Sequence, residues 1–509
     1  FFKSQYNIYA TIVILWGSFM AIKDANKQYI KFDTAVQVLK YEVLKRIAEK
    51  EFDGTLDKEK LNIAKEIVDD LKPNVRCCIY KERAIVEERM KLALGGHENR
   101  ENMIEVIDIA CDECPVNRFI VTDACRGCLA KKCRDSCNFE AISFDNRKCK
   151  IDYEKCKECG KCKEVCPYNA IAEVKRPCMR ACIPKALSYD VDSKKAVIDD
   201  SKCIQCGACV VDCPFGAIMD KSYLVDVIRL LKDEKKVFAI VAPAISSQFN
   251  HSKIGKVITA IKKLGFEDVF EAALGADLVA VHECNEFKEK DKLDFMTTSC
   301  CPAFVSYIEK NYPELKECIS NTVSPMVAMA RLIKSQNKDV KTVFIGPCIA
   351  KKTEAKRNEV SGDVDYVLTF EELLALLDSR NIKIDECEES DTKHGSFYGR
   401  LFARSGGVTE SVKHLIDSEG IKVDFRPILG DGIKDCDIKL RLAKLKRAQG
   451  NFLEGMACKG GCINGPGSLN HDIKNSKEVD KYGELSSSEK IKDTLADIKF
   501  EDLNLSKNE

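Results

Sequence analysis

Apolar residues follow a helical spacing through much of the first hundred positions. Three stretches carry apolar side chains three or four positions apart, at residues 34–51, 58–71 and 82–94. The last of them runs into Gly95-Gly96, a pair that commonly ends a helix. We therefore predict that residues 1–105 form a mostly helical N-terminal region.

Residues 4–22 break this pattern because they carry no charge. Their length approaches that of a membrane span, roughly 20 residues. However, polar residues such as Ser4, Gln5 and Asn7 dilute the apolar centre, and no convincing small-x-small cleavage site follows. We expect a packed helix or a stretch outside the core rather than a membrane anchor or a targeting signal.

Beyond residue 220, short β-branched runs alternate with helical stretches. The pattern predicts strands at residues 237–241, 342–345 and 365–368, and helices at residues 254–264, 302–310 and 370–378. Such alternation is typical of parallel sheets packed between helices, with functional sites at the carboxyl ends of the strands. We predict an α/β domain over residues 221–475, followed by a polar tail over residues 476–509 without assigned chemistry.

Cysteine content is the one unusual feature of the composition. Among 509 residues, 45% are hydrophobic and 32% charged, and Lys+Arg and Asp+Glu both number 81, so no nucleic-acid partner is expected. The 28 cysteines recur at C-x-x-C spacings in a long chain, which indicates metal binding in a reducing compartment, the cytoplasm, rather than a disulfide scaffold. Zinc sites also use C-x-x-C pairs, but they do not repeat a C-x-x-C-x-x-C-x-x-x-C-P run.

Residues 106–220 contain most of these cysteines, arranged in runs. The runs are Cys125-x2-Cys128-x4-Cys133-x3-Cys137, Cys156-x2-Cys159-x2-Cys162-x3-Cys166 and Cys203-x2-Cys206-x2-Cys209-x3-Cys213. A reduced copy, Cys178-x3-Cys182, lies between the last two. In two-cluster ferredoxins the first three cysteines of a run bind one [4Fe–4S] cube and the fourth binds the other.

This crossing rule assigns the cysteines to three cubes. It groups Cys125, Cys128 and Cys133 with Cys166, then Cys156, Cys159 and Cys162 with Cys137, and finally Cys203, Cys206 and Cys209 with Cys182. Cys178 and Cys213 then lack two partners, and the pair Cys111-x2-Cys114 can complete a fourth cube. We predict three to four accessory cubes, and we expect Cys149, which lies outside every run, to be structural.

Three later segments carry cysteines beside residues that bend the chain: TTSCCPAF at residues 297–304, GPCIAKKTE at 346–354 and MACKGGC at 456–462. They contribute Cys301, Cys348, Cys458 and Cys462, with Cys300 beside the first. Four thiolates brought together by a fold are what a further cube needs. Buried, inert cysteines are the alternative, which three bent, cysteine-bearing loops disfavour.

The motifs TSCCP, PCxxKxxE and MACxxGC resemble, in order and separation, the three signature motifs of the [FeFe] hydrogenases. With the preceding cysteine runs, the resemblance is to the monomeric clostridial type and covers residues 111–467. It implies ferredoxin-like 2[4Fe–4S] modules followed by an α/β H-cluster domain with two parallel-sheet lobes. The H-cluster is a [4Fe–4S] cube joined to a diiron unit that carries CO, cyanide and a bridging dithiolate. By motif, the four cysteines bind the cube and Cys462 bridges to the diiron unit.

The resemblance also implies a proton relay. Cys300 would be the first protein proton carrier, because a tuned thiol can exchange protons near neutral pH. Glu283 and Glu286 lie three positions apart and share a helical face. Together with Ser324 they would connect Cys300 to solvent, whereas without the motifs two such glutamates would indicate only a solvated helix face.

Other residues would hold the diiron unit. Lys351 would donate a hydrogen bond to an iron-bound cyanide and be oriented by Glu354, while its neighbour Lys352 is better explained as a surface lysine. Further cofactor contacts are expected from Pro243, Ala244, Phe402 and Met456.

Some positions depart from the family pattern. Many relatives have Met where this chain has Gly346, Trp where it has Phe304, and Gly-Gly-Gly-Gln-Pro where it has residues 465–469. These residues line or support the pocket in relatives, so the chain is identified as a member of a divergent subgroup.

The implied function is reversible 2H⁺ + 2e⁻ ⇌ H₂. The substrates would be protons and H₂, the partner a ferredoxin or similar electron carrier, and separate maturation proteins would install the diiron unit. Alternatives are a non-catalytic H-cluster sensor, which commonly has appended signalling domains and often lacks the Cys300 thiol, and an iron–sulfur assembly factor of the same fold, whose members lose the equivalents of Lys351 and Cys300. A plain polyferredoxin explains only residues 111–218.

Overall fold

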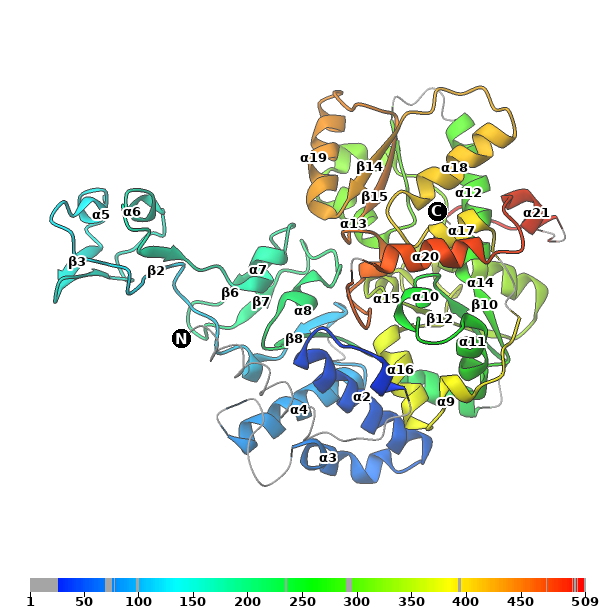
Figure 1. Cartoon of the computed structure of the whole chain (residues 1–509), viewed down its shortest axis with the longest axis horizontal. Coiled ribbons are helices and arrows are strands. Elements are labelled where there is room, and N and C mark those ends of the chain that lie inside the picture. Colours follow the sequence, from blue (N-terminus) through cyan, green and yellow to red (C-terminus); the bar gives the residue numbers. More distant parts are fainter. Residues whose placement is uncertain are drawn as a thin grey trace. The chain divides into compact units, whose positions relative to one another are not determined.

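The computed structural model of the chain describes residues 26–68, 76, 78–97, 100–233, 236–289, 295–391, 395–472, 474–496, 498, 500 and 502–507. The expectation for residues 4–22 lies outside this described part. The chain forms two compact units: residues 104–220, and a larger unit built from the described residues before 104 and after 220 (Figure 1). None of the helices in the described part is both long and apolar enough to cross a membrane.

Residues 104–220 consist of short antiparallel strand pairs and one-turn helices. β1 (Ile104–Val106) pairs with β8 (Ile218–Asp220), β2 (Phe119–Val121) with β5 (Ile171–Glu173), β3 (Ile142–Asp145) with β4 (Lys148–Ile151), and β6 (Leu187–Tyr189) with β7 (Ala196–Ile198). The helices are η2 (Asp108–Ala110), α5 (Lys132–Asp135), α6 (Lys161–Glu164), α7 (Pro177–Ala181) and α8 (Ala208–Asp212). These elements form two copies of one ferredoxin-like module, each with one long-range strand pair, one hairpin and two short α-helices.

The two modules are nested. The inner module, with β2–β5 and the β3–β4 hairpin, is inserted between β1 and α7 of the outer module, which has β1–β8 and the β6–β7 hairpin. Cys111-x2-Cys114 and Cys178-x3-Cys182 are therefore the two halves of one run that the insertion interrupts. This nesting explains the reduced copy seen in the sequence, because its first two cysteines lie before the insertion.

The N-terminal helices belong to the larger unit. They are α2 (Ala35–Phe52), α3 (Leu56–Ile67) and α4 (Ile79–Ala93), as the apolar spacing predicts. Helix α2 packs on α16 (Phe370–Ser379), where Lys40 forms a buried 2.5 Å ion pair with Glu371 and the Tyr41 hydroxyl donates to Asp378 over 2.6 Å. These contacts join the N-terminal helices to the domain that follows residue 220. The helices are therefore not the separate region that the sequence suggests.

A four-stranded parallel sheet forms the first lobe of the larger unit. Its spatial order is β10 (Asp268–Glu271), β9 (Val237–Val241), β12 (Lys341–Gly346) and β13 (Tyr366–Thr369). The apolar β9 is buried along its whole length, as expected for a central parallel strand. Accompanying helices are α9 (Leu224–Lys232), α10 (Ile245–Gln248), α11 (Ile254–Lys263), α12 (Ala272–Glu289), α14 (Pro325–Gln336) and α16. The strands and helices predicted in this lobe are confirmed to within one residue at each end.

A three-stranded parallel sheet forms the second lobe, in the order β11 (Met296–Thr297), β15 (Phe452–Met456) and β14 (Pro427–Asp431). Its helices include α13 (Pro302–Asn311), α18 (Gly407–Ser418) and α19 (Ile433–Lys444). The expected two parallel-sheet lobes are thus confirmed, although the sequence pattern did not locate these three strands. The remaining elements are η1 (Lys27–Tyr29), η3 (Pro313–Cys318), α15 (Ala350–Glu354), η4 (Asn358–Val360), η5 (Ile384–Glu386), α17 (Phe397–Leu401), η6 (Cys462–Asn464), α20 (Asn475–Glu484) and α21 (Ile491–Leu495).

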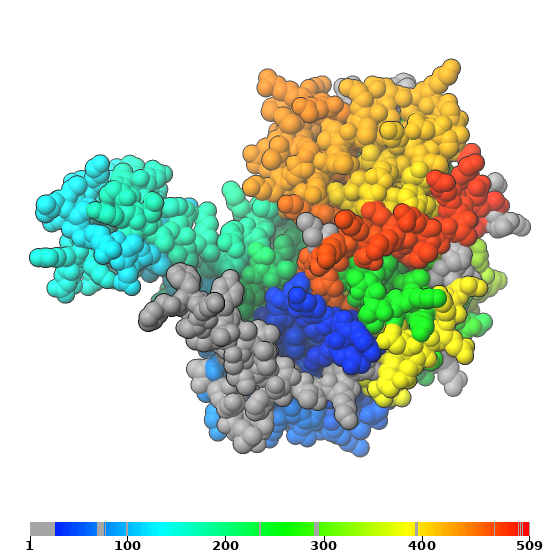
Figure 2. All heavy atoms as spheres, in the orientation of Figure 1, coloured from blue at the N-terminus to red at the C-terminus, as the bar shows by residue number. Residues whose placement is uncertain are grey.

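The C-terminal segment corrects another expectation. Residues 476–509 were expected to be a polar tail, but Val479, Ile491 and Leu505 are buried in the core. Helix α20 packs on α10 and α17, and in Figure 2 this red segment lies against green and yellow parts of the same unit. The apolar residues are too widely spaced among polar ones to give a clear periodic pattern, so their burial becomes visible only in the fold.

Candidate functional site

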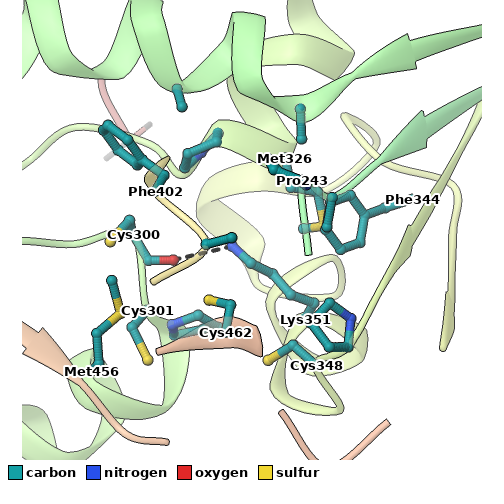
Figure 3. Close-up of a pocket in the computed structure, with 17 residues that line it drawn as sticks. Pro243, Cys300, Cys301, Met326, Phe344, Cys348, Lys351, Phe402, Met456 and Cys462 are labelled. Carbon is teal, nitrogen blue, oxygen red and sulfur yellow. Dashed lines mark hydrogen bonds between the residues drawn. The ribbon is translucent and has the colours of Figure 1, made fainter. Parts of the chain in front are cut away.

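The carboxyl ends of both parallel sheets meet at one cavity. Loops following β9, β11, β12 and β15 line it, at the sheet edge where α/β folds usually place their ligand sites. The lining is largely apolar apart from cysteines and one lysine (Figure 3). It comprises Ala242, Pro243, Ala272, Ala276, Cys300, Cys301, Pro302, Pro325, Met326, Phe344, Pro347, Cys348, Lys351, Phe402, Ala403, Met456 and Cys462.

Three of the four cysteines predicted to bind the central cube line this cavity: Cys301, Cys348 and Cys462. Burial, more than any other cause, raises the pKa of Cys348 to about 11 and that of Cys462 to about 12, and the neighbouring Cys301 adds to both. The free thiols therefore hold their protons until a metal displaces them. Cys458 is not among the lining residues.

Cys301 stands at the N-terminus of α13, directly before Pro302. Burial raises the pKa of the Cys301 thiol, while backbone N–H groups of Ala303, Phe304 and Ala457 hydrogen-bond to its sulfur and oppose that rise. Proline suits the first helical position because it lacks an N–H that would otherwise have no partner there. The helix start therefore directs N–H groups towards this sulfur, an arrangement that would favour its anionic form.

Lys351 brings a positive charge into this apolar cavity. Its Nζ donates to Glu354 Oε2 over 2.6 Å and to the Cys300 carbonyl over 3.2 Å (Figure 3). Burial alone would lower the pKa of Lys351, but Glu354, together with Cys348 and Cys300, outweighs it and the pKa is raised. The ammonium therefore stays charged at neutral pH.

The adjacent Lys352 is not the surface residue that the sequence suggested. It is fully buried, and its Nζ forms a 3.0 Å ion pair with Glu372 and donates to the Lys221 carbonyl over 2.7 Å. A buried cation needs such partners because burial without them is costly. Lys352 thus faces away from the cavity into the protein.

Glu283 lies on α12, fully buried, behind Cys300. Its Oε1 accepts the Ser299 N–H over 3.4 Å, and its Oε2 has no hydrogen-bond partner within the described part of the chain. Burial, reinforced by Glu286, raises the pKa of Glu283 to about 8. Burial also raises the pKa of Cys300, followed by the effect of Glu283. The two groups are therefore coupled and both favour the protonated form at neutral pH.

Glu286 lies on the same helix and is half-buried. Its carboxylate accepts from the Ser320 hydroxyl over 2.5 Å, from the Asn321 N–H over 2.8 Å and from the Thr322 hydroxyl over 3.1 Å. Thr322 Oγ1 also lies 2.8 Å from Nδ1 of His282, which is half-buried. The carboxylate is thus linked through one hydroxyl to an imidazole.

Ser324, predicted as a relay member, makes no hydrogen bond to either glutamate in the described part of the chain. It stands at the N-cap position of α14 but makes no side-chain capping bond, and its buried Oγ has no hydrogen-bond partner among the described residues. Ser320, which the sequence did not single out, bonds to Glu286 instead. Spacing along the chain does not reveal which serine reaches a carboxylate on another element, and the polar triplet at residues 320–322 was the only available signal.

Three of the four remaining predicted cofactor-contact residues line the cavity. Pro243, Phe402 and Met456 line the cavity, whereas Ala244 is buried next to it without lining it. Met326 and Phe344 are lining residues that sequence reasoning missed. Both are apolar residues of ordinary core spacing, so nothing in the pattern distinguished them.

The departures from the family motifs have steric explanations. A Cβ added at Gly346 would lie 2.6 Å from the Phe344 ring, so the glycine makes room for this ring beside the cavity. A Cβ at Gly455 would lie 2.2 Å from the ring of Phe304, which packs directly on β15. The Gly467 N–H donates to the Pro347 carbonyl over 2.8 Å, which fastens the segment at residues 465–469 to the loop that carries Cys348.

Three smaller cavities in residues 104–220 contain the accessory cysteines in the groups predicted by the crossing rule. The first is lined by Cys125, Cys128, Cys133 and Cys166, the second by Cys137, Cys156, Cys159 and Cys162, and the third by Cys182, Cys203, Cys206 and Cys209. The first cavity also contains Cys149.

A fourth group follows from the nesting of the modules. Cys114 and Cys178 each have a pKa raised first by burial and then by cysteines of one set: Cys111, Cys114, Cys178 and Cys213. This set is the outer-module equivalent of Cys125, Cys128, Cys133 and Cys166. The structure thus brings together sixteen accessory cysteines in four groups, while their role as cluster ligands stays a prediction.

Backbone N–H groups point at sulfurs in every module. Ala170, Ala186 and Ala217 donate to the cysteine four residues before each of them over 3.2–3.3 Å. Among the described residues, no group of three or more His, Cys, Asp or Glu side chains is arranged around a single metal ion. Cubes fit this arrangement because each of the four cysteines binds a different iron.

Known proteins resemble both compact units of the chain. Residues 235–466 match the family described as iron only hydrogenase large subunit, C-terminal domain, and residues 149–172 and 196–219 match the 4Fe-4S binding domain. The chain is 28% identical to iron hydrogenase 1 of Clostridium pasteurianum over 51% of this chain and 55% of that protein. It is 30% identical to the periplasmic [Fe] hydrogenase large subunit of Nitratidesulfovibrio vulgaris over 48% of this chain and 72% of that protein.

A non-hydrogenase relative is also similar. The cytosolic Fe-S cluster assembly factor narfl of Xenopus tropicalis is 27% identical over 48% of this chain and 65% of that protein. The chain spans about half the length of the clostridial relative. From the extent of the match to the periplasmic large subunit, the chain belongs to the iron-only hydrogenase family.

Proposed function

We propose that this protein is an [FeFe] hydrogenase that catalyses 2H⁺ + 2e⁻ ⇌ H₂. The observation that carries the proposal is the meeting, in one cavity, of three cysteines suited to a cube, a further thiol at Cys300 and the buried cation Lys351. An H-cluster supplies, when bound, the redox centre at which H₂ is made or split. The protein's own part is to hold this group, exclude water and move protons and electrons.

The residues present fit an H-cluster. Cys301, Cys348 and Cys462 offer sulfurs within one cavity, and Cys458 follows in the same motif as Cys462. Lys351 offers an ammonium that stays charged, which favours an anionic ligand such as cyanide. Apolar side chains occupy the rest of the wall, so bulk water is kept from the site.

Protons would pass through Cys300, Glu283 and Glu286, in that order. Glu283 is protonated near neutral pH and can both donate and accept, as a general acid–base group must. Ser320 and Thr322 hold the Glu286 carboxylate, and the Thr322 hydroxyl passes the connection to His282. The relay therefore ends at a residue that reaches the surface.

Electrons would travel through the accessory cubes of residues 104–220. The four cysteine groups satisfy the ligand requirement of [4Fe–4S] clusters. The partner would be a ferredoxin or a similar small carrier, and the diiron unit would come from separate maturation proteins.

The test is H₂ production from reduced methyl viologen after anaerobic maturation, together with the CO and CN infrared bands of the diiron unit. Cys300→Ala should lower the rate by about 10²–10⁴-fold while the bands persist. Cys284→Ala is the matched control, because Cys284 is a buried cysteine of α12 that does not line the cavity.

An assembly factor is the second candidate, favoured by the similarity to narfl. It predicts bound cubes but no CO or CN bands after maturation that succeeds on a control hydrogenase. Bands accompanied by negligible turnover in the parent would instead indicate a hydrogen sensor.

A further inference from the structure

The two nested modules place different side chains at one equivalent position. Cys149 of β4 and Ala196 of β7 both stand two residues before the isoleucine that ends the strand and seven before the first cysteine of the following run. Each donates its backbone N–H over 3.4 Å to the first cysteine sulfur of its module, Cys125 and Cys111 respectively. Cys149 and Ala196 therefore occupy equivalent positions in the two hairpins. The outer module serves as an internal comparison for the inner one.

One cavity of the inner module contains five cysteine sulfurs instead of four. Cys149 is 7% exposed and lines the same cavity as Cys125, Cys128, Cys133 and Cys166. Cys149 and Cys133 line one cavity, so the Cys149 thiol is placed to donate a hydrogen bond to the Cys133 sulfur. In the outer module the equivalent of Cys133 is Cys178, and the residue opposite it is Ala196, whose methyl group has nothing to donate.

The equivalence also identifies the surplus sulfur. Cys133 and Cys178 each stand four residues before the last cysteine of their run, and each lies in a short helix, α5 or α7. Cys133 therefore has a ligand counterpart in the outer module, whereas Cys149 has none. The longer gap in the first run does not displace Cys133 from the group.

We propose that Cys149 is a positioning residue for the inner-module cube of Cys125, Cys128, Cys133 and Cys166. Its S–H hydrogen bond to Cys133 raises the reduction potential of this cube above that of the outer-module cube of Cys111, Cys114, Cys178 and Cys213. A hydrogen bond to a ligand sulfur stabilises the more negative, reduced state of the cluster, and such bonds are among the main determinants of cluster potential. The proposal rests on the electron relay of the proposed function. It gives the relay a step in potential between two otherwise equivalent cubes.

Two opposite substitutions in the full-length, cube-loaded chain test this. Cys149→Ala copies the outer module, and Ala196→Cys copies the inner one. The readouts are iron content per chain and the accessory midpoint potentials from EPR-monitored redox titration. Cys149→Ala should lower one potential and leave the others unchanged, and Ala196→Cys should raise a different one. Cys149→Ser, which keeps a donor, should give a smaller shift than Cys149→Ala.

Cys387→Ala is the control, because Cys387 is a buried cysteine of the larger unit and should move no potential. A loss of about four irons in Cys149→Ala would make Cys149 a ligand and overturn the proposal. Unchanged potentials with iron retained would overturn it as well. A parent chain that binds no accessory cubes under conditions that load a control ferredoxin would instead refute the relay on which the proposal depends.

Discussion

Cysteines occupy contrasting surroundings in the two compact units. In residues 104–220 they sit on loops and one-turn helices over thin strand pairs, where Cys159 is exposed and Leu129, within the first run, is 99% exposed. In the larger unit they face a cavity walled by buried side chains, among them Phe344, Phe402 and Met456. Shallow clusters suit electron exchange with a partner, whereas a deep apolar site strengthens electrostatic interactions but needs its own proton path.

Removing one cysteine from each unit should produce the largest difference. We expect Cys348→Ala to abolish H₂ production with every electron donor, because the cavity loses a cube ligand. Cys159→Ala should also lose about four irons, but it should keep H₂ production from methyl viologen and lose it mainly with reduced ferredoxin. Iron analysis and rates with the two donors measure this contrast.

Cys436→Ala is a useful control for Cys348→Ala, because Cys436 is buried near Cys301 without lining the cavity. Equal loss of activity with both donors in Cys159→Ala would contradict the prediction. It would show that methyl viologen cannot bypass the accessory unit.

Glu283 tests whether the buried cavity of the larger unit depends on a proton path through the protein. Glu283→Gln keeps the shape of the side chain but removes its proton exchange, so we expect H₂ production to fall by about 10²–10⁴-fold. The infrared bands of the diiron unit should persist, because Glu283 lies behind Cys300 and does not line the cavity. Loss of the bands would show that the residue supports assembly of the site instead.

The same substitution should change the pH dependence of stability. The pKa of Glu283 is about 8 in the folded chain against about 4.5 when unfolded, so stability is lost as pH rises between these values. Glu283→Gln escapes this loss and should be more stable than the parent at pH 9, by up to about 5 kcal/mol, and similar at pH 4. Denaturant unfolding at the two pH values measures the difference.

Lys40 tests whether the N-terminal helices belong to the deep unit. Lys40→Met breaks the buried ion pair between Lys40 and Glu371, so unfolding of the larger unit should become easier by about 3–5 kcal/mol. The double variant Lys40→Met/Glu371→Leu should recover most of this loss. The accessory EPR signals should be unaffected, and a parallel loss of those signals would mean that the two units do not unfold independently.

Local spacing made much of this molecule predictable. The cysteine groups of the inner module follow from the runs themselves, and the β-branched run of β9 predicts a central strand with its observed ends. The outer module was harder, because an insertion separates Cys114 from Cys178 and leaves only half a run visible. The burial of Lys352 and the hydrogen bond of Ser320 to Glu286 depend on which elements pack together. The periodicity of the sequence does not predict that packing.

The smallest expected effect concerns the end of the proton path. Thr322 Oγ1 donates to Glu286 and so accepts from Nδ1–H of His282. Burial lowers the pKa of His282, and Glu286 and Glu289 only partly oppose it. The imidazole is therefore neutral at pH 7 and can take a proton from solvent at Nε2 while Nδ1 passes one inward.

His282→Gln should lower H₂ production at pH 7 by a few-fold and remove the acid limb that His282 contributes to the pH–rate profile. Added imidazole should restore part of the rate, which loss of a merely structural contact would not allow. An unchanged profile would mean that protons reach Glu286 past Ser320 and Asn321 instead. The deep site would then exchange protons with solvent through the loop at residues 320–322, without a group that titrates near neutral pH at its exit.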